Sequence, residues 1–221
     1  FYQTASEARV EAQYALACLY ENGDGVSQSL VKAAAWYRKA AEQGHCFAQQ
    51  SLGDLYKRGD GVRQSYAKAG VWYRKAAVQG YSWAQLALGD LYKKGDGVRQ
   101  NAAKAQSWYT KAADQGNRSA EYALGCLYEK GEICSRDFAE AAAWYRKAAE
   151  QGHASAQDAL ARLYTNGHGV PQNFAEAMVW HLKAAEQGSA WAQYALGDVY
   201  ESGKITPQNF SEAAVWYRKA A

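Results

Sequence analysis

The sequence predicts an all-α solenoid of about six 36-residue helix–turn–helix repeats, and three observations predict it. The first is the block WYRKAA, found at 36–41, 72–77, 144–149 and 216–221 and, in edited form, at 108–113 and 180–185. The second is a helical apolar periodicity between these blocks, and the third is a set of glycines that return at the same positions. One hairpin cannot bury both of its apolar faces, so we expect each copy to pack against the next.

Each repeat is expected to form two helices, A and B, as residues 47–80 illustrate. Helix A places apolar residues on one face at i, i+4, i+7 and i+8, namely Ala48, Leu52, Leu55 and Tyr56. Helix B follows a short loop and carries the second apolar face, namely Ala69, Trp72, Tyr73, Ala76 and Ala77. We expect the tryptophan of each helix B, and thus six of the eight tryptophans, to belong to the core together with the tyrosine that follows it in five of the six repeats.

The ends of the helices are marked as regularly as their faces. Helix B is expected to begin after a residue that is favoured as an N-cap, at Ser29, Ser65, Asn101, Asp137, Asn173 and Asn209. Glycines are expected to end the A helices, at Gly23, Gly59, Gly95, Gly131, Gly167 and Gly203. The loops after Gly131 and Gly203 lack the second glycine of the other loops, so we expect a different backbone path there.

Length, charge and hydropathy restrict the class of protein. We expect one elongated domain over 1–221, with 1–10 as a cap or a degenerate helix and repeats at about 11–46, 47–82, 83–118, 119–154, 155–190 and 191–221. The net charge of +3 is small and its basic residues are scattered, so no nucleic-acid partner is expected. No apolar run is long enough to insert into a membrane. The chain begins at Phe1 without a methionine, so we expect a fragment, whose unsealed ends could self-associate.

Candidate chemistry in the sequence is explained by the repeat. Ser29 with Lys32, and Ser65 with Lys68, match the Ser-x-x-Lys motif of penicillin-binding serine hydrolases, but both serines are expected N-caps and no companion motif follows. The four histidines do not form a zinc-binding pattern, so no metal, cofactor or catalytic residue is predicted. Whether Cys126 and Cys134 form a disulfide is left open.

The repeated unit resembles the Sel-1-like repeat, a relative of the tetratricopeptide repeat. The resemblance covers residues 11–221 and includes the paired Gly-x-Gly loop, the AxxWYxKAA block and the Gln-Gly turn. It implies a right-handed superhelix whose A helices line a concave groove for a protein partner, and it does not imply an enzyme. His181 departs from the pattern, because the other repeats have a tyrosine at this position.

Partner binding is predicted at positions that the repeat does not dictate. On the first A helix these are 11, 14, 18, 21 and 22, opposite its core face, and we call them and their equivalents the A-helix stripe. Aromatic residues here could form binding hot spots or merely fill the seam between repeats. The predicted partner-binding residues are Phe47, Trp83, Tyr122, Trp191 and Tyr194, with Asp54, Asp90, Arg162 and Asp198 setting the register.

The sequence therefore predicts a non-catalytic protein-interaction scaffold that holds a folded effector or a peptide in its A-helix groove. As a finer expectation, bacterial members of the family suggest an immunity protein that neutralises a secreted effector, in the periplasm or exported. An adaptor in signalling, cell-envelope or host-interaction complexes is the alternative. A serine hydrolase is the least favoured alternative.

Overall fold

The computed structural model describes residues 2–133, 135–203 and 205–221 of the chain. These residues form twelve α-helices and no β-strand, as predicted for a solenoid of helical hairpins. The helices fall into two compact units, Phe1–Gln115 and Gly116–Ala221. None of the described helices is both long and apolar enough to cross a membrane.

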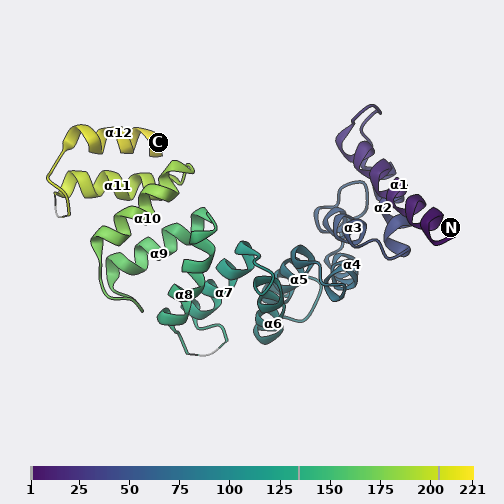
Figure 1. Cartoon of the computed structure of the whole chain (residues 1–221), viewed down its shortest axis with the longest axis horizontal. Coiled ribbons are helices and arrows are strands. Elements are labelled where there is room, and N and C mark those ends of the chain that lie inside the picture. Colours follow the sequence, from purple (N-terminus) through teal and green to yellow (C-terminus); the bar gives the residue numbers. More distant parts are fainter. Residues whose placement is uncertain (1, 134, 204) are drawn as a thin grey trace. The chain divides into compact units, whose positions relative to one another are not determined.

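The first unit consists of three hairpins, each an A helix followed by a B helix (Figure 1). Each A helix of this unit packs against the B helix after it, and the first two B helices also pack against the A helix that follows them. The expected cap lies in the first half of α1, which is 21 residues long. The helices of this unit are α1 (Tyr2–Asn22), α2 (Leu30–Glu42), α3 (Cys46–Arg58), α4 (Tyr66–Val78), α5 (Ser82–Lys94) and α6 (Ala102–Ala113).

The second unit repeats this arrangement with three further hairpins, and α7, α9 and α11 are its A helices (Figure 1). Its helices are α7 (Arg118–Lys130), α8 (Phe138–Glu150), α9 (Ala154–Asn166), α10 (Phe174–Glu186), α11 (Ala190–Ser202) and α12 (Phe210–Ala220). The expected change of loop path after Gly131 and Gly203 involves Cys134 and Lys204, which lie outside the described residues.

The predicted caps of the B helices are confirmed. In each B helix the cap side chain accepts a hydrogen bond from a backbone N–H of the first turn, as from Lys104 to Asn101 Oδ1 at 2.8 Å. Five A helices end at a glycine in the left-handed region, with φ between +64° and +86°. These glycines end each helix where the sequence predicts, because an L side chain is strained at positive φ.

The second glycine of the loop has a separate steric role. A Cβ atom on Gly61 would lie 2.2 Å from the carbonyl carbon of Leu30, and one on Gly169 would lie 2.2 Å from that of Phe138. The loop therefore passes directly over the first turn of the preceding B helix, which only a residue without a side chain permits.

The core is built from alanine, leucine and tyrosine, and the tryptophan prediction is only partly correct. Tyr37, Tyr73, Tyr109 and Tyr145 are fully buried. Among the tryptophans of the B helices only Trp180 is buried, and the other five are partly exposed. In each of these six helices a lysine Nζ lies 3.9–4.4 Å from the centre of the tryptophan ring. The tryptophans thus cover the edge of the core and hold a lysine by a cation–π contact.

Buried glutamines connect one repeat to the next, a feature that the sequence analysis did not predict. Gln85 Nε2 donates to the carbonyl of Ala77 in the preceding repeat at 3.1 Å, and Gln85 Oε1 accepts from Gln115 Nε2 at 2.8 Å. The pattern recurs at Gln49, Gln157 and, for the first of these bonds, Gln193. Because a buried amide is stable only when it is hydrogen bonded, these bonds define the register between repeats.

Candidate partner-binding surface

The predicted aromatic residues of the A-helix stripe lie on the A helices of both units, and most are exposed. The exposed fractions are 46% for Phe47 on α3, 50% for Trp83 on α5, 58% for Trp191 and 51% for Tyr194, both on α11. Tyr122 on α7 is partly buried. Side chains with this exposure are only partly covered by the fold, so a large part of each ring is available to a partner.

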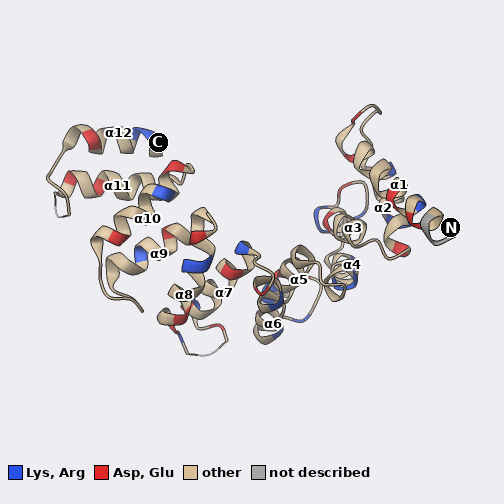
Figure 2. Cartoon of the chain, in the orientation of Figure 1, with Lys and Arg blue, Asp and Glu red and all other residues tan. Residues whose placement is uncertain are grey.

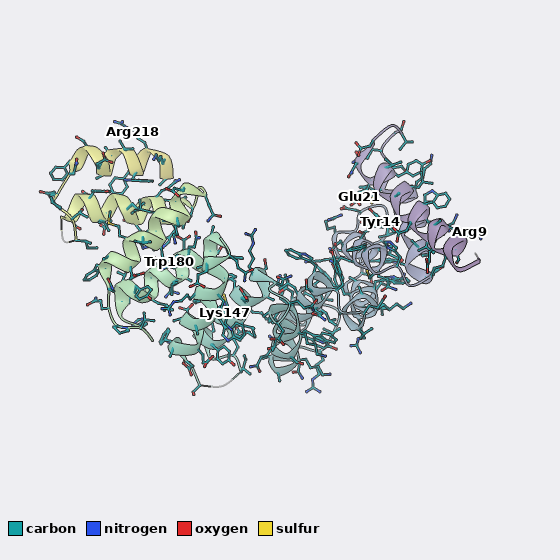
Figure 3. All side chains as sticks on the ribbon, in the orientation of Figure 1. Arg9, Tyr14, Glu21, Lys147, Trp180 and Arg218 are labelled. Carbon is teal, nitrogen blue, oxygen red and sulfur yellow. The ribbon has the colours of Figure 1, made fainter. Side chains whose placement is uncertain are left out.

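In the first unit the stripe includes a cluster of rings contributed by successive repeats. The ring of Phe47 meets the edge of Tyr81 at 5.0 Å between centroids and lies 6.1 Å from Tyr14, which is labelled on α1 in Figure 3. Tyr14 also stacks on His45 at 4.5 Å. This cluster leaves Phe47 nearly half exposed, so seam filling and partner contact are compatible at this residue.

His45 and His153 serve as N-caps of A helices, which the sequence analysis did not foresee. Nδ1 of His45 accepts from the N–H of Ala48 at 3.1 Å, and Nδ1 of His153 accepts from that of Ala156 at 3.2 Å. An accepting Nδ1 requires the neutral ring. At His153, burial and the neighbouring Arg118 lower the pKa of the imidazole, which favours this form.

The predicted register residues Asp54 and Asp90 are also part of the fold. Asp54 Oδ1 accepts the hydroxyl proton of the buried Tyr73 at 2.6 Å, and Asp90 accepts that of Tyr109 at 2.7 Å. Burial and the Asp54 carboxylate raise the pKa of Tyr73, so its hydroxyl stays a donor. A carboxylate satisfying a buried hydroxyl is needed whether or not a partner binds.

The same tyrosine–carboxylate bond recurs with a glutamate one turn further along helix A. Tyr37 donates to Glu21 at 2.5 Å, Tyr145 to Glu129 at 2.7 Å and Tyr217 to Glu201 at 2.6 Å. Figure 3 labels Glu21 on α1. This alternation between two acid positions explains why the stripe carries acidic residues, and it was not predicted from the sequence.

The fifth repeat departs from this pattern, because His181 replaces the tyrosine. His181 is 6% exposed, and burial lowers the pKa of its imidazole to about 4. Its Nδ1 lies 4.0 Å from Oδ1 of Asp158, which is too far for a hydrogen bond. Within the described part of the chain neither atom has a hydrogen-bond partner, although Ser189 donates to the other oxygen of Asp158 at 2.5 Å.

The remaining predicted residues of the second unit fall into two groups. Tyr122 stacks on His153 at 4.7 Å, and Arg162 forms an ion pair with Glu129 of the preceding repeat. Trp191 and Tyr194 stack at 6.0 Å between ring centroids. Tyr122 and Arg162 are thus held by residues of neighbouring repeats, whereas Trp191 and Tyr194 are about half exposed on α11.

A cavity of about 390 Å³ brings Trp191, Tyr194 and Asp198 together in the second unit. Its other walls come from α9, α10 and the loop after α11, and include Phe174 and His181. The volume lies near the lower end of the range for ligand pockets, roughly 300–1,000 Å³. Three residues predicted from the stripe thus share one apolar hollow.

The motifs that suggested catalysis have structural partners. Ser29 and Ser65 accept from the backbone N–H of Lys32 and Lys68 at 3.4 and 3.3 Å. The ammonium groups of these lysines lie over tyrosine rings, at 5.2 Å from Tyr20 for Lys32.

Among the described residues no cluster of His, Cys, Asp and Glu could hold a metal ion. Acidic and basic residues are interspersed along the ribbon of each unit (Figure 2).

Comparison with known proteins gives consistent matches to one family. The Sel1 repeat profile matches six segments, 10–45, 46–81, 84–117, 118–153, 154–189 and 192–221. No curated protein matches the chain significantly.

Three solved structures illustrate the structural similarity. The protective antigen c5321 of uropathogenic Escherichia coli displays an SLR fold and is 40% identical to this chain, with a TM-score of 0.91. The match covers 100% of this chain and 47% of the antigen, so this chain spans about half the length of the antigen. A Sel1 repeat protein from Oxalobacter formigenes is 33% identical with a TM-score of 0.88, over 96% of this chain and 85% of the other. The immunity protein Pa5087 from Pseudomonas aeruginosa is 25% identical with a TM-score of 0.58, over 96% and 81% of the two chains.

Proposed function

Because the chain belongs to the Sel1 repeat family, we propose that it is a non-catalytic scaffold that binds a protein partner through the aromatic residues of its A-helix stripe. Sel1 repeats are typical of protein–protein interaction scaffolds and are generally non-catalytic. The observation that carries the proposal is the exposure of Phe47, Trp83, Trp191 and Tyr194, each about half exposed on an A helix.

The fold itself does not require these rings. The position of Trp83 and Trp191 is occupied by Glu11, Ser119 and Ser155 in other repeats, which form the same helix. Tryptophan and tyrosine are enriched among the few residues that carry most of the binding energy of an interface. Exposed rings on the A helices therefore support a partner-binding role for this side of each unit.

The experiment is affinity capture from the native extract, with wild type compared with the double variant Trp83→Ala/Trp191→Ala. If both rings are hot spots, each truncation costs roughly 2 kcal/mol or more of binding free energy, and the variant retains no partner. Thermal melting of both proteins separates binding from folding, because half-exposed rings contribute little to stability.

The matched control is Val71→Ala/Phe210→Ala, which truncates one exposed apolar residue in each unit on the B-helix side. This control should capture the partner as wild type does. The proposal is wrong if the Trp83→Ala/Trp191→Ala variant, here called the stripe variant, also captures the partner. It is also wrong if the stripe variant melts several degrees lower while the control does not, because the two rings would then support the fold.

A second and finer proposal is that the partner is a secreted bacterial effector and that this chain neutralises it. The likeness to an immunity protein over 96% of the chain supports this. The test is to express the captured partner in bacteria with wild type or with the stripe variant. Growth rescued by wild type alone supports neutralisation, whereas a partner that is harmless by itself supports an adaptor instead.

A further inference from the structure

The cavity of the second unit has aromatic and aliphatic walls. Phe174 of α10 and Trp191 and Tyr194 of α11 supply the rings, and Met178 and Val199 supply the aliphatic surface. Trp191 and Tyr194 are more than half exposed, so the rings are accessible from solvent. Walls of this kind accept either an apolar group or a cation, because the face of an aromatic ring attracts positive charge.

The charge of the lining favours a cation. Asp198 lines the cavity, and no lysine or arginine does so among the described residues. In repeats 2 and 3 the equivalent Asp54 and Asp90 accept a tyrosine hydroxyl, but in repeat 6 Tyr217 donates to Glu201 instead. Asp198 is thus an exposed carboxylate that this recurring bond of the fold does not use.

The inner wall adds a polar side chain that carries no competing positive charge. His181 lines the cavity, and burial lowers the pKa of its imidazole to about 4, so the ring is neutral near pH 7. The negative charge of Asp198 is therefore unopposed among the described residues that line the cavity.

We propose that this cavity binds the side chain of an arginine on the protein partner. A guanidinium has five donors and no acceptor, stacks on aromatic faces and pairs with carboxylates, and its aliphatic stem packs on apolar walls. Those properties match the rings, the aliphatic walls and Asp198. An acidic side chain would meet Asp198, and a neutral apolar one would leave that carboxylate unpaired. The inference rests on the proposed function, because it names the partner group that the A-helix stripe of α11 receives.

The test is an NMR titration of the whole ¹⁵N-labelled chain with two tripeptides, N-acetyl-Gly-Arg-Gly-amide and its citrulline counterpart. Citrulline has nearly the shape of arginine but no charge. The indole N–H of Trp191, assigned with Trp191→Phe, should shift saturably with the arginine peptide, and the citrulline peptide should bind at least about tenfold more weakly. Asp198→Asn should weaken arginine binding about tenfold and leave citrulline binding unchanged. Glu186→Gln, which removes the same charge from an exposed site on α10 outside the cavity, should bind as wild type.

Equal binding of the two peptides, or no shift at about 10 mM arginine peptide, which exceeds the millimolar Kd expected of one side chain, would overturn the inference. That failure differs from a failure of the proposed function. If Trp191→Ala loses the captured partner while neither peptide binds, the function stands and the arginine assignment is wrong. If the arginine peptide binds selectively but capture does not depend on Trp191, the cavity assignment stands and the proposed function is wrong.

Discussion

Replacing Gln85 with leucine should destabilise the first unit by about 1–2 kcal/mol, because two buried hydrogen bonds are lost while the volume is nearly kept. Gln85 is 4% exposed, and its amide bonds Ala77 O at 3.1 Å and Gln115 at 2.8 Å. Each net bond contributes about 0.5–1.5 kcal/mol. The sum is reduced because Ala77 O still accepts from Gly80, and Gln115 still donates to Lys111 O.

The assay is equilibrium unfolding in guanidinium chloride, followed by circular dichroism, with hydrogen exchange locating the loss of protection. The matched control is Gln100→Leu, which removes an exposed amide that donates to Lys93 O at 2.9 Å. Exposed substitutions usually change stability by less than about 0.5 kcal/mol. We expect Gln85→Leu to lower protection in α4 and α5, where the repeats meet. If Gln85→Leu and Gln100→Leu are equally stable, the glutamine bonds do not hold the repeats in register.

Three further predictions concern the caps, the tyrosines and the buried histidine. Asn101→Ala should cost about 1 kcal/mol of unfolding free energy and Asn101→Ser much less, measured by the same unfolding assay, because only the hydroxyl can replace the cap. Tyr109→Phe should cost about 1–3 kcal/mol, since Asp90 loses its buried donor, and wild-type stability would show that this bond contributes nothing. For His181, the pKa of about 4 in the folded state lies below the unfolded value near 6.5. The stability that the protein gains by keeping this imidazole neutral is therefore fully present above pH 6.5 and is lost as the pH falls towards 4. The free-energy difference between wild type and His181→Asn should therefore fall by about 2–3 kcal/mol from pH 7.5 to 4.5, and a difference independent of pH would contradict a neutral buried imidazole.

The repeat architecture could be predicted because local signals and packing agree in every copy. Ser65 and Asn101 are predicted N-caps, and their side chains accept the expected hydrogen bonds from the first turn of the helix. Gly59 ends its helix in the left-handed region, as predicted. The burial of the tryptophans was predicted only in part, because helical periodicity shows which face of a helix a residue lies on but not how deeply its side chain is buried. Trp72 lies at the edge of that face, where Lys75 covers its ring, while Tyr73 is at the centre.

The polar contacts between helices were harder to predict. Gln49 and Gln85 resemble surface residues in sequence, and their burial is decided by the preceding repeat, where they bond carbonyl groups. Asp54 varies between repeats like a binding residue, yet it satisfies Tyr73 because the acid can come from either of two helix positions. His181 was noticed as a departure, but its unpartnered Nδ1 facing Asp158 depends on tertiary distances that no spacing gives.

Photo-crosslinking of the captured complex tests the central claim most directly. A benzophenone amino acid replaces Trp83 or Tyr194 on the A-helix stripe, or Val71 or Val215, which are exposed on B helices. If the partner lies on the stripe, we expect crosslinks from positions 83 and 194 and none from 71 and 215. Crosslinks from 71 and 215 alone would contradict the account, because the partner would then lie on the B-helix side.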